Sequence, residues 1–394
     1  MTTQRAPLFL TATTLASALG TGRAATLAAL RDRRTGLSRC DFAGIAAGYV
    51  GRVAGIEDHA LPQPLARFDC RTHRLADLAL RADGFAEAVA AARARYGAAR
   101  IAVVVGTSTS GILSAEEAYR DRDPETGALP AWFDYDHTHD MAALVRFVRA
   151  ALDLEGPSFV VSTACASAAR AFADAERLIA AGLADAAVVG GADSLCRMTL
   201  RGFAALELIS STQCRPGAAD RAGLSIGEAA GFALLEPDGE GVALLGAGAS
   251  SDGYHMSAPR PDGAGAAAAM RAALDAARLG PEAIDYINLH GTGTKANDAM
   301  EDAAVLTVFG AATPCSSTKA WSGHTLGAAG IVEAVIAELC IRHGLRPGAL
   351  FLDAPDPALG ARLLVANEVG TVRRVMSNSF GFGGINCSLV LGAA

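Results

Sequence analysis

A cysteine stands where a strand pattern changes to a helix pattern, within VSTACASAA at residues 161–169. Backbone N–H groups and the helix dipole at such a junction stabilise an anion, so we expect Cys165 to have a lowered pKa and to act as a nucleophile. A free cysteine is also often a small buried core residue. This segment alone leaves both interpretations open.

A histidine follows a short strand pattern and opens HGTGTKANDAMED at residues 290–302. Beside His290, the hydroxyls of Thr292 and Thr294 suit a polar chain such as the arm of a carrier. A structural histidine with satisfied hydrogen bonds is the simpler interpretation of this segment taken alone. Two acids in the first turns of the following helix are expected to stabilise its N-terminus: Asp298 and Glu301.

A second histidine, His324, lies in STKAWSGHTLGAAGIVEA at residues 317–334, between Lys319 and Glu333. A nearby lysine disfavours the imidazolium form and keeps the ring neutral. We therefore expect His324 to donate or accept a hydrogen bond at neutral pH.

A glycine-rich segment, NSFGFGGIN, occupies residues 378–386. Its glycines permit positive φ and close approach of the backbone, so its N–H groups can bind an anion beside an apolar wall of Phe380 and Phe382. A plain turn remains open for this segment in isolation. The loop, the cysteine, the two histidines and the lysine each stand at a junction between a strand and a helix, and that combination is hard to explain by chance.

The same residue types could also bind a metal. Cys165, His290 and His324 form a ligand set that suits zinc, although we expect no metal, and metal analysis would discriminate the two cases. The segment at residues 131–144 holds a second possible group of metal ligands: Asp136, His137, His139 and Asp140. No further ligands accompany them, so we expect this segment to be a solvated loop.

The composition describes a large acidic protein with an extensive core. The chain has 394 residues, of which 51% are hydrophobic and 19% charged, with 43 glycines for close packing. A net charge of −7 without a basic run argues against nucleic acid as the main partner. The eight cysteines form no CxxC pair, which indicates a reducing cytoplasm. We expect no membrane span, and residues 1–20 carry too little positive charge for a signal peptide.

Short β-branched runs alternate with alanine-rich helical stretches, which predicts an α/β architecture with buried sheets. The clearest strand patterns lie at residues 100–105, 159–162, 186–189, 231–235, 242–246, 284–289 and 372–377. The clearest helical patterns lie at residues 75–96, 166–181, 265–279 and 328–341. Small and apolar residues are nearly continuous in these helices, which predicts burial on more than one side.

The chain is expected to consist of two related halves, residues 1–239 and 240–394, which meet at the PDGEG segment. Residues 161–182 and 316–339 both run from a Ser-Thr strand end, past one reactive residue, into a long helix of small residues. Two such halves facing each other would bring two helix N-termini towards a shared centre.

These motifs resemble those of the elongating β-ketoacyl-acyl carrier protein synthases, which have the thiolase fold. The resemblance rests on TACASA, HGTGT, the K-x-x-x-G-H-T-x-G-A-A-G pattern and NSFGFGGIN, and extends to CRMTLRGFAAL and DGYHMSAP. It covers residues 95–394 well and the first stretch only loosely. It implies an α/β thiolase-like fold, with two halves stacked as α-β-α-β-α layers, and no cofactor.

The resemblance implies a catalytic cycle for a 3-oxoacyl-[acyl-carrier-protein] synthase, an acyltransferase. Cys165 would take the acyl chain from an acyl carrier protein as a thioester. His290 and His324 would hold the thioester carbonyl of a malonyl carrier protein and promote its decarboxylation, after which the enolate attacks the acyl group. Lys319 and Glu333 resemble the supporting pair that orients His324.

The resemblance also implies supporting roles for further residues. The amides of Cys165 and Phe382 would form the oxyanion hole, and Phe382, with Phe380 beside it, would gate access to the pocket. Contacts to the phosphopantetheine arm and the acyl chain are expected from Thr109, Thr292, Thr294, Gly381 and Gly383.

Single residues separate the chain from neighbouring families. A thiolase would have a second catalytic cysteine in the GFGG loop, whereas Cys387 lies beyond it, and an initiating synthase would have asparagine in place of His324. The main alternative is a non-catalytic or chain-length-determining subunit of a ketosynthase heterodimer. A chain-length factor typically lacks the cysteine, so the presence of Cys165 argues against that alternative, as do His290, Lys319 and His324.

Other features depart from the common fatty-acid enzymes. GTSTSGI at residues 106–112 has Thr and Ser where larger residues often close the acyl tunnel, and residues 20–75 are shorter and dissimilar. We therefore expect a dedicated synthase for a polyene, such as an aryl polyene, or another polyketide. The resemblance implies a homodimer, or a heterodimer with a paralogue. Docking of an acidic carrier protein would need a basic patch, for which the candidates are Arg67, Arg71, Arg74, Arg197 and Arg201.

Overall fold

The computed structural model describes residues 7–42, 45 and 48–393 and contains one large sheet in which the same topology occurs twice. The first set of strands has the order β6 (Ser158–Val161), β5 (Ile101–Gly106), β7 (Ala186–Asp193), β9 (Ala229–Glu236) and β1 (Leu8–Ser17). The second has the order β12 (Cys315–Ser316), β11 (Tyr286–Asn288), β15 (Arg374–Gly381), β16 (Ile385–Ala393) and β10 (Val242–Ser251). In each set the first three strands are parallel and the last two pair antiparallel. The same strand order thus occurs once in each of the two predicted halves.

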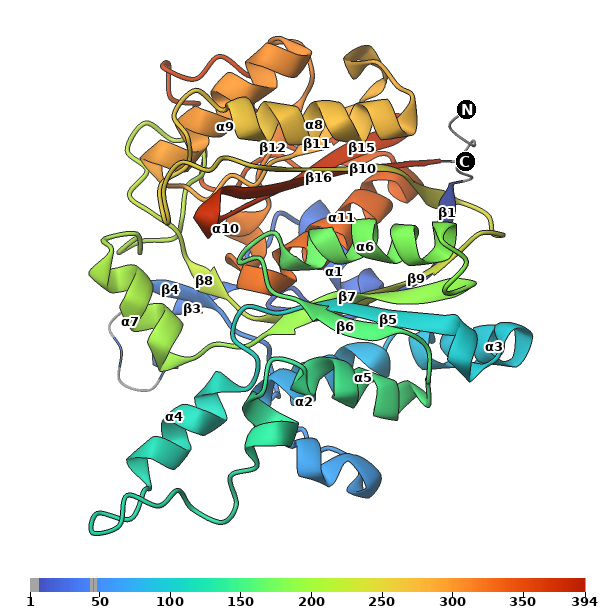
Figure 1. Cartoon of the computed structure of the whole chain (residues 1–394). Helices are drawn as coiled ribbons and strands as arrows, with labels where there is room; N and C mark the ends of the chain where they lie inside the picture. The colour runs from blue at the N-terminus through green and yellow to red at the C-terminus, as the bar shows by residue number, and fades with distance from the viewer. Residues whose placement is uncertain (1–6, 43–44, 46–47, 394) are drawn as a thin grey trace.

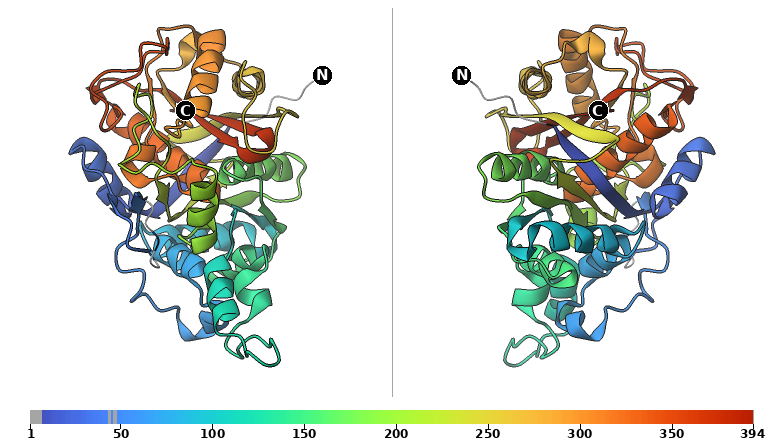
Figure 2. Two further views of the ribbon diagram at one scale, coloured as in Figure 1. Left: turned by 90° about the vertical axis from the view of Figure 1, so that its left-hand side faces the viewer. Right: turned by 90° about the vertical axis from the view of Figure 1, so that its right-hand side faces the viewer.

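The helices form three layers around the two sets of strands (Figure 1). Between the sets lie α6 (Ser167–Ala180) and α11 (Ala329–His343), which pack against each other and against strands of both halves. The outer face of the first set carries α2 (Arg71–Leu80), α3 (Phe85–Tyr96) and α5 (Ala143–Leu152). The outer face of the second carries α8 (Ala264–Ala277), with α9 (Lys295–Phe309) packed against it. Figure 2 shows the layers from two further sides, and they confirm the α-β-α-β-α arrangement.

The central helices explain the small residues of the sequence. Every residue of α11 from Ala329 to Cys340 is buried, as its apolar pattern predicts. A Cβ added to Gly330 would lie 2.4 Å from the backbone nitrogen of Ala169 on α6, closer than atoms can approach. Only glycine therefore permits this contact between the two central helices.

The remaining elements surround this core. They are β2 (Gly20–Thr21), α1 (Arg23–Arg31), β3 (Leu37–Arg39), β4 (Tyr49–Gly51), α4 (Ile112–Arg120), α7 (Arg197–Ala205), β8 (Ile226–Gly227), α10 (Lys319–Ser322), β13 (Leu345–Arg346) and β14 (Glu368–Val369). Short helical turns lie at Gln63–Phe68, Ala98–Arg100, Tyr135–His139, Pro281–Ala283, Leu326–Ala328 and Phe382–Gly384. Within the described ranges, no helix is long and apolar enough to cross a membrane.

One predicted helix is wrong. The pattern at residues 75–96 predicts a continuous helix, but α2 ends at Leu80 and α3 begins at Phe85. Between them Asp83 and Gly84 have φ angles of 58° and 70°, which break a helix. The Asp83 carboxylate accepts hydrogen bonds of 3.1 Å from the backbone nitrogen of Arg23, so a distant segment fixes this turn.

Candidate active site

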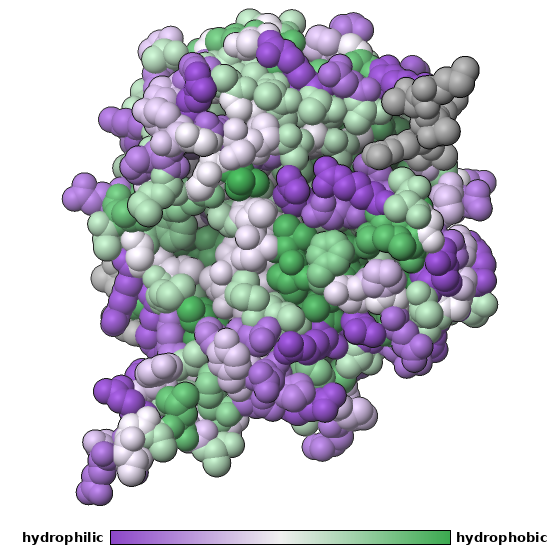
Figure 3. Space-filling model, in the orientation of Figure 1, coloured by the Kyte–Doolittle hydropathy of each residue, from purple (hydrophilic) through white to green (hydrophobic). Residues whose placement is uncertain are grey.

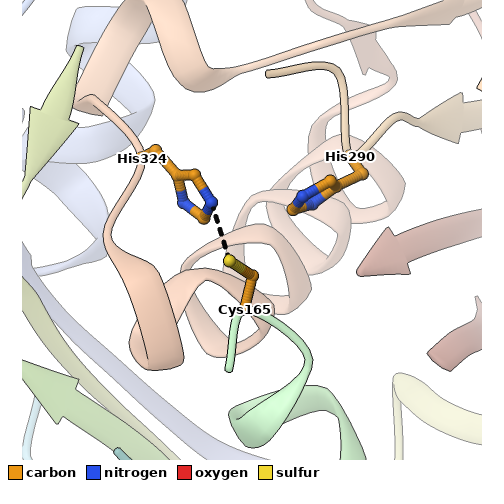
Figure 4. A group of neighbouring side chains, drawn as sticks. All are labelled: Cys165, His290 and His324. Atoms are coloured by element: carbon orange, nitrogen blue, oxygen red, sulfur yellow. Dashed lines mark hydrogen bonds between the residues drawn. The ribbon is translucent and has the colours of Figure 1, made fainter. Parts of the chain in front are cut away.

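Three loops bring Cys165, His290 and His324 together between the two halves (Figure 4). Cys165 lies between β6 and α6, His290 follows β11, and His324 follows α10. Their side-chain sulfur and nitrogen atoms lie within 4.8 Å of one another, and all three residues are buried. The two imidazole rings stand edge-on with centroids 5.3 Å apart. The predicted cluster therefore exists.

The hydrogen bonds of His324 fix the position of its proton. Its Nδ1 accepts a hydrogen bond of 3.2 Å from the backbone nitrogen of Leu326. Burial, and then the charge of Lys319, lower the pKa of His324 well below its ordinary value, so the ring is neutral. A neutral ring whose Nδ1 accepts must carry its proton on Nε2. Nε2, which lies 3.1 Å from the sulfur of Cys165, is therefore a hydrogen-bond donor.

The predicted lowering of the Cys165 pKa is wrong. Burial raises the pKa of Cys165 to about 11, although the charge of Lys319 and the backbone N–H of Phe382 act in the opposite direction. The physical reason is that the sulfur is buried away from water between neutral imidazoles. Cys165 consequently rests as a thiol.

His290 is held through its backbone, while its ring forms no hydrogen bond with the part of the chain that the structure describes. Burial, and then Lys319 and His324, lower the pKa of His290 well below its ordinary value. Its Nδ1 is buried and has no partner among the described residues. The carboxylate of Glu301 accepts hydrogen bonds from the backbone nitrogens of His290, at 2.8 Å, and Gly291, at 2.7 Å. The loop thus presents a second neutral imidazole to the site.

The two acids after His290 are not helix caps, contrary to the sequence-based expectation. Glu301 binds the backbone of the His290 loop, and Asp298 accepts hydrogen bonds from Gly217 and Gly293. The cap of α9 is instead Thr294, which accepts a hydrogen bond from the backbone nitrogen of Asn297. Both acids are buried, so they anchor loops within the core.

Lys319 and Glu333 form the expected pair. Both side chains are buried, and the Lys319 Nζ lies 2.5 Å from an oxygen of Glu333. Burial raises the pKa of Glu333 to about 7, and the adjacent ammonium group opposes that rise. The charge of Lys319 also lowers the pKa of His324, as the sequence predicts, and it lowers the pKa of His290 in the same way.

A cavity of about 240 Å³ leads to the three side chains. The predicted residues that line it are Cys165, His290, Thr292, Thr294, His324, Phe380, Gly381, Phe382 and Gly383. The Phe382 ring packs against Phe203 of α7, with centroids 5.4 Å apart. Thr109 does not line this cavity: it is buried, and its hydroxyl donates a hydrogen bond of 2.8 Å to Asp193.

The cluster also has the composition of a zinc site, which leads to a first prediction. Zinc would bind the thiolate of Cys165 together with a nitrogen of His290 and of His324, and it would leave the sulfur unavailable as a nucleophile. We expect plasma emission analysis of the purified protein to find far less than one zinc per chain, and a chelator to leave condensing activity unchanged. Stoichiometric zinc that is required for activity would contradict this assignment.

The second possible metal site, at residues 131–144, does not assemble. His137 pairs with Asp134, and the described residues show no group of three metal ligands around it.

Comparison with known proteins assigns this site to a class. Residues 64–240 match the model of the beta-ketoacyl synthase N-terminal domain, and residues 242–353 match that of the C-terminal domain. The chain belongs to the beta-ketoacyl synthase family. It is therefore an acyltransferase that forms carbon–carbon bonds, of the 3-oxoacyl-[acyl-carrier-protein] synthase type.

Particular relatives refine this assignment. The chain is 38% identical over 312 residues to 3-oxoacyl-[acyl-carrier-protein] synthase 2 of Rhizobium meliloti, covering 73% of each protein. It is 40% identical, with a TM-score of 0.90 and complete coverage of both chains, to a chain of the ketosynthase (ApeO) in complex with its chain length factor (ApeC) from Xenorhabdus doucetiae. The ishigamide ketosynthase/chain length factor is 29% identical, with a TM-score of 0.88, and covers 99% of this chain and 100% of its own.

Proposed function

We propose that this chain is the catalytic ketosynthase of a heterodimer that extends a specialised chain, such as a polyene or an aryl polyene. The observation that carries this proposal is its similarity, at 40% identity over its whole length, to a chain of a ketosynthase and chain length factor complex. Similarity to the Rhizobium meliloti enzyme covers only 73% of the chain. The complete cysteine, histidine and lysine set supports the catalytic role over that of the non-catalytic subunit.

The first half-reaction transfers the acyl chain to Cys165. Its sulfur attacks the thioester carbonyl of the acyl carrier, a new C–S bond forms, and the carrier thiol leaves. Because the thiol pKa is about 11, the proton leaves Cys165 as the bond forms and ends on the departing carrier sulfur. The backbone N–H groups of Cys165 and Phe382 would receive the negative charge that develops on the carbonyl oxygen.

The second half-reaction removes carbon dioxide from the malonyl carrier and forms the new bond. The Nε2–H of His324 and the ring of neutral His290 would donate hydrogen bonds to the thioester oxygen. Cleavage of the C–C bond to the carboxylate places negative charge on that oxygen, so these donors stabilise the transition state more than the ground state. The enolate carbon then attacks the acyl carbonyl, and the Cys165 sulfur leaves as a thiolate, which takes a proton from water to restore the thiol.

The carrier arm would enter through the cavity. Thr292 and Thr294, whose hydroxyls lie 2.9 Å apart, line this cavity, where they would bind the amides of phosphopantetheine. Gly383 has a φ of 81°, so this conformation of the loop beside Phe382 favours glycine.

The structure leaves only some of the predicted basic residues available to an acidic carrier. Three of the five arginines already form ion pairs within the chain. Arg71 pairs with Glu57 and Glu228. Arg74 pairs with Asp69, and Arg197 pairs with Glu116. Arg67 and Arg201 are exposed, with no ion pair within the described residues. Arg201 lies on α7, whose Phe203 lines the cavity, and we assign carrier docking to this helix.

A second subunit would cover the exposed edge of the sheet. β6 ends the strand order and pairs only with β5 in the described chain, and its Phe159 is 38% exposed. Figure 3 shows apolar side chains gathered on this face of the molecule. Further large exposed apolar residues lie between α4 and α5: Leu129, Trp132, Tyr135 and Met141. This surface suits contact with a paralogous subunit.

The cysteines bear on the compartment in which the protein works. All eight are free thiols, which suits a reducing cytoplasm.

Substrate competition tests this proposal. We expect the chain, produced together with its partner subunit, to prefer polyunsaturated over saturated acyl carriers of equal length by about 10-fold or more in kcat/KM. The Cys165→Gln variant supplies the background rate. A clear preference for saturated chains would contradict the proposed role in extending a polyene. Full activity of a homodimer would contradict the proposed heterodimer. Absence of any condensation would remove the catalytic role.

A further inference from the structure

A buried carboxylate lies beside the catalytic loops. Asp193 ends β7, is completely buried and forms no ion pair within the described ranges. Its Oδ1 accepts hydrogen bonds from the hydroxyl of Thr107, at 2.6 Å, and from the hydroxyl and backbone nitrogen of Thr109, at 2.8 and 3.0 Å. The backbone nitrogen of Ser108 donates to both of its oxygens, at 3.0 and 2.9 Å. One loop therefore fixes the orientation of this carboxylate.

The same carboxylate reaches the turn that follows His324. Its Oδ2 accepts a hydrogen bond of 2.6 Å from the backbone nitrogen of Gly327. A Cβ at Gly327 would lie 2.7 Å from both this Oδ2 and the backbone nitrogen of Ser108. The turn thus packs directly on the carboxylate, with no room for a side chain between them.

The turn also determines which nitrogen of His324 carries the proton. Leu326, the residue before Gly327, donates its backbone N–H to the Nδ1 of His324 at 3.2 Å. Its φ of 54° is a conformation that costs energy for leucine and needs support from its surroundings. The hydrogen bond from Gly327 to Asp193 supplies such support one residue away.

We propose that Asp193 is a positioning residue that keeps the proton of His324 on Nε2 by holding the turn at Leu326 and Gly327. The proposal rests on the ketosynthase function assigned to the site. If the turn moved, Nδ1 would lose its donor and the proton could reside there instead. Nε2 would then be an acceptor, which cannot stabilise negative charge on a thioester oxygen.

The chemistry of this contact requires a carboxylate. Backbone N–H groups of Ser108, Thr109 and Gly327 all point at Asp193, so both of its oxygens must accept. Asparagine in its place would direct its own NH₂ group towards at least one of these donors. Asp193→Asn therefore leaves at least one of these N–H groups facing an NH₂ group, which disturbs the loop or the turn while it keeps nearly the same volume.

The test compares Asp193→Asn with Glu338→Gln in the full chain with its partner subunit. Glu338 is an equally buried acid on α11 that binds Thr13 and Arg342, away from the cavity. We expect Asp193→Asn to lower malonyl carrier decarboxylation by about 10²-fold, with a much smaller effect on acylation of Cys165, and Glu338→Gln to leave both rates unchanged. Nitrogen NMR of ¹⁵N-histidine-labelled protein should show the Nε2–H tautomer of His324 in the parent and its loss in Asp193→Asn.

A second variant keeps the test decisive if Asp193→Asn does not fold. Thr109→Val removes one donor to the carboxylate at nearly constant volume, and we expect a smaller loss of decarboxylation in the same direction. Unchanged decarboxylation and an unchanged tautomer in a folded variant would overturn the role of Asp193. If the parent protein itself fails to decarboxylate malonyl carrier, the proposed function fails instead.

Discussion

Replacement of Cys165 with serine or glutamine is expected to abolish condensation while malonyl decarboxylation persists or rises. The sulfur is the only atom of the cluster that can hold the acyl chain, because both imidazoles are neutral hydrogen-bond donors in the proposed cycle. A serine hydroxyl in the same place is a far weaker nucleophile without a base beside it. Condensation should therefore fall by at least about 10³-fold.

The two reactions can be followed separately in one preparation. Release of carbon dioxide from the malonyl carrier reports decarboxylation, and mass analysis of the carrier-bound product reports condensation. Cys40→Ser is a matched control, because Cys40 is partly exposed and lies outside the residues that line the cavity. If Cys165→Ser retained normal condensation, the nucleophile would have to be another residue.

His324→Ala is expected to abolish decarboxylation as well as condensation. His324 supplies the Nε2–H donor whose direction is fixed by the backbone of Leu326, and alanine leaves the thioester oxygen with His290 alone. Removal of one such donor from a water-excluded site costs about 10²–10³-fold in rate. The loss should appear in the release of carbon dioxide from the malonyl carrier, with or without an acyl group on Cys165.

His343, at the end of α11, provides the control for the His324→Ala variant. His343 ends α11 at an exposed position, so His343→Ala should leave both reactions unchanged. An unaffected rate of decarboxylation in His324→Ala would show that His290 suffices, and would remove His324 from the proposed cycle.

The residue types at the centre of the site could be predicted from the sequence because they lie in short motifs. Cys165, His290, Lys319 and His324 each stand where a strand pattern meets a helix pattern, and the structure brings the cysteine and both histidines together. The neutral state of His324 could be predicted from the nearby Lys319, but the ionisation of Cys165 could not be predicted from its motif alone. A helix N-terminus predicts a lowered pKa for Cys165, but burial, which depends on the whole fold, outweighs it.

The supporting residues were missed for a similar reason. The sequence predicts that Glu301 caps a helix, whereas its carboxylate binds the backbone of His290 and the side chain of Asn378 on β15. Asp193 carries no local signal at all, because its partners come from residues 107–109 and 327. Long-range contacts of this kind have no periodicity along the chain, whereas the strands and most helices do.

The position of β1 has a consequence for how the protein folds. This first strand lies at the seam of the sheet, where it pairs with β9 along its length and with β10 near its start. Both partners are synthesised more than 200 residues later, so the seam closes only after much of the chain has left the ribosome. Pairing of such high contact order is slow and leaves strand edges exposed in the meantime. Each half holds all five strands of its own set, whereas the β1–β10 junction that unites the two halves cannot form until Val242–Ser251 has been synthesised.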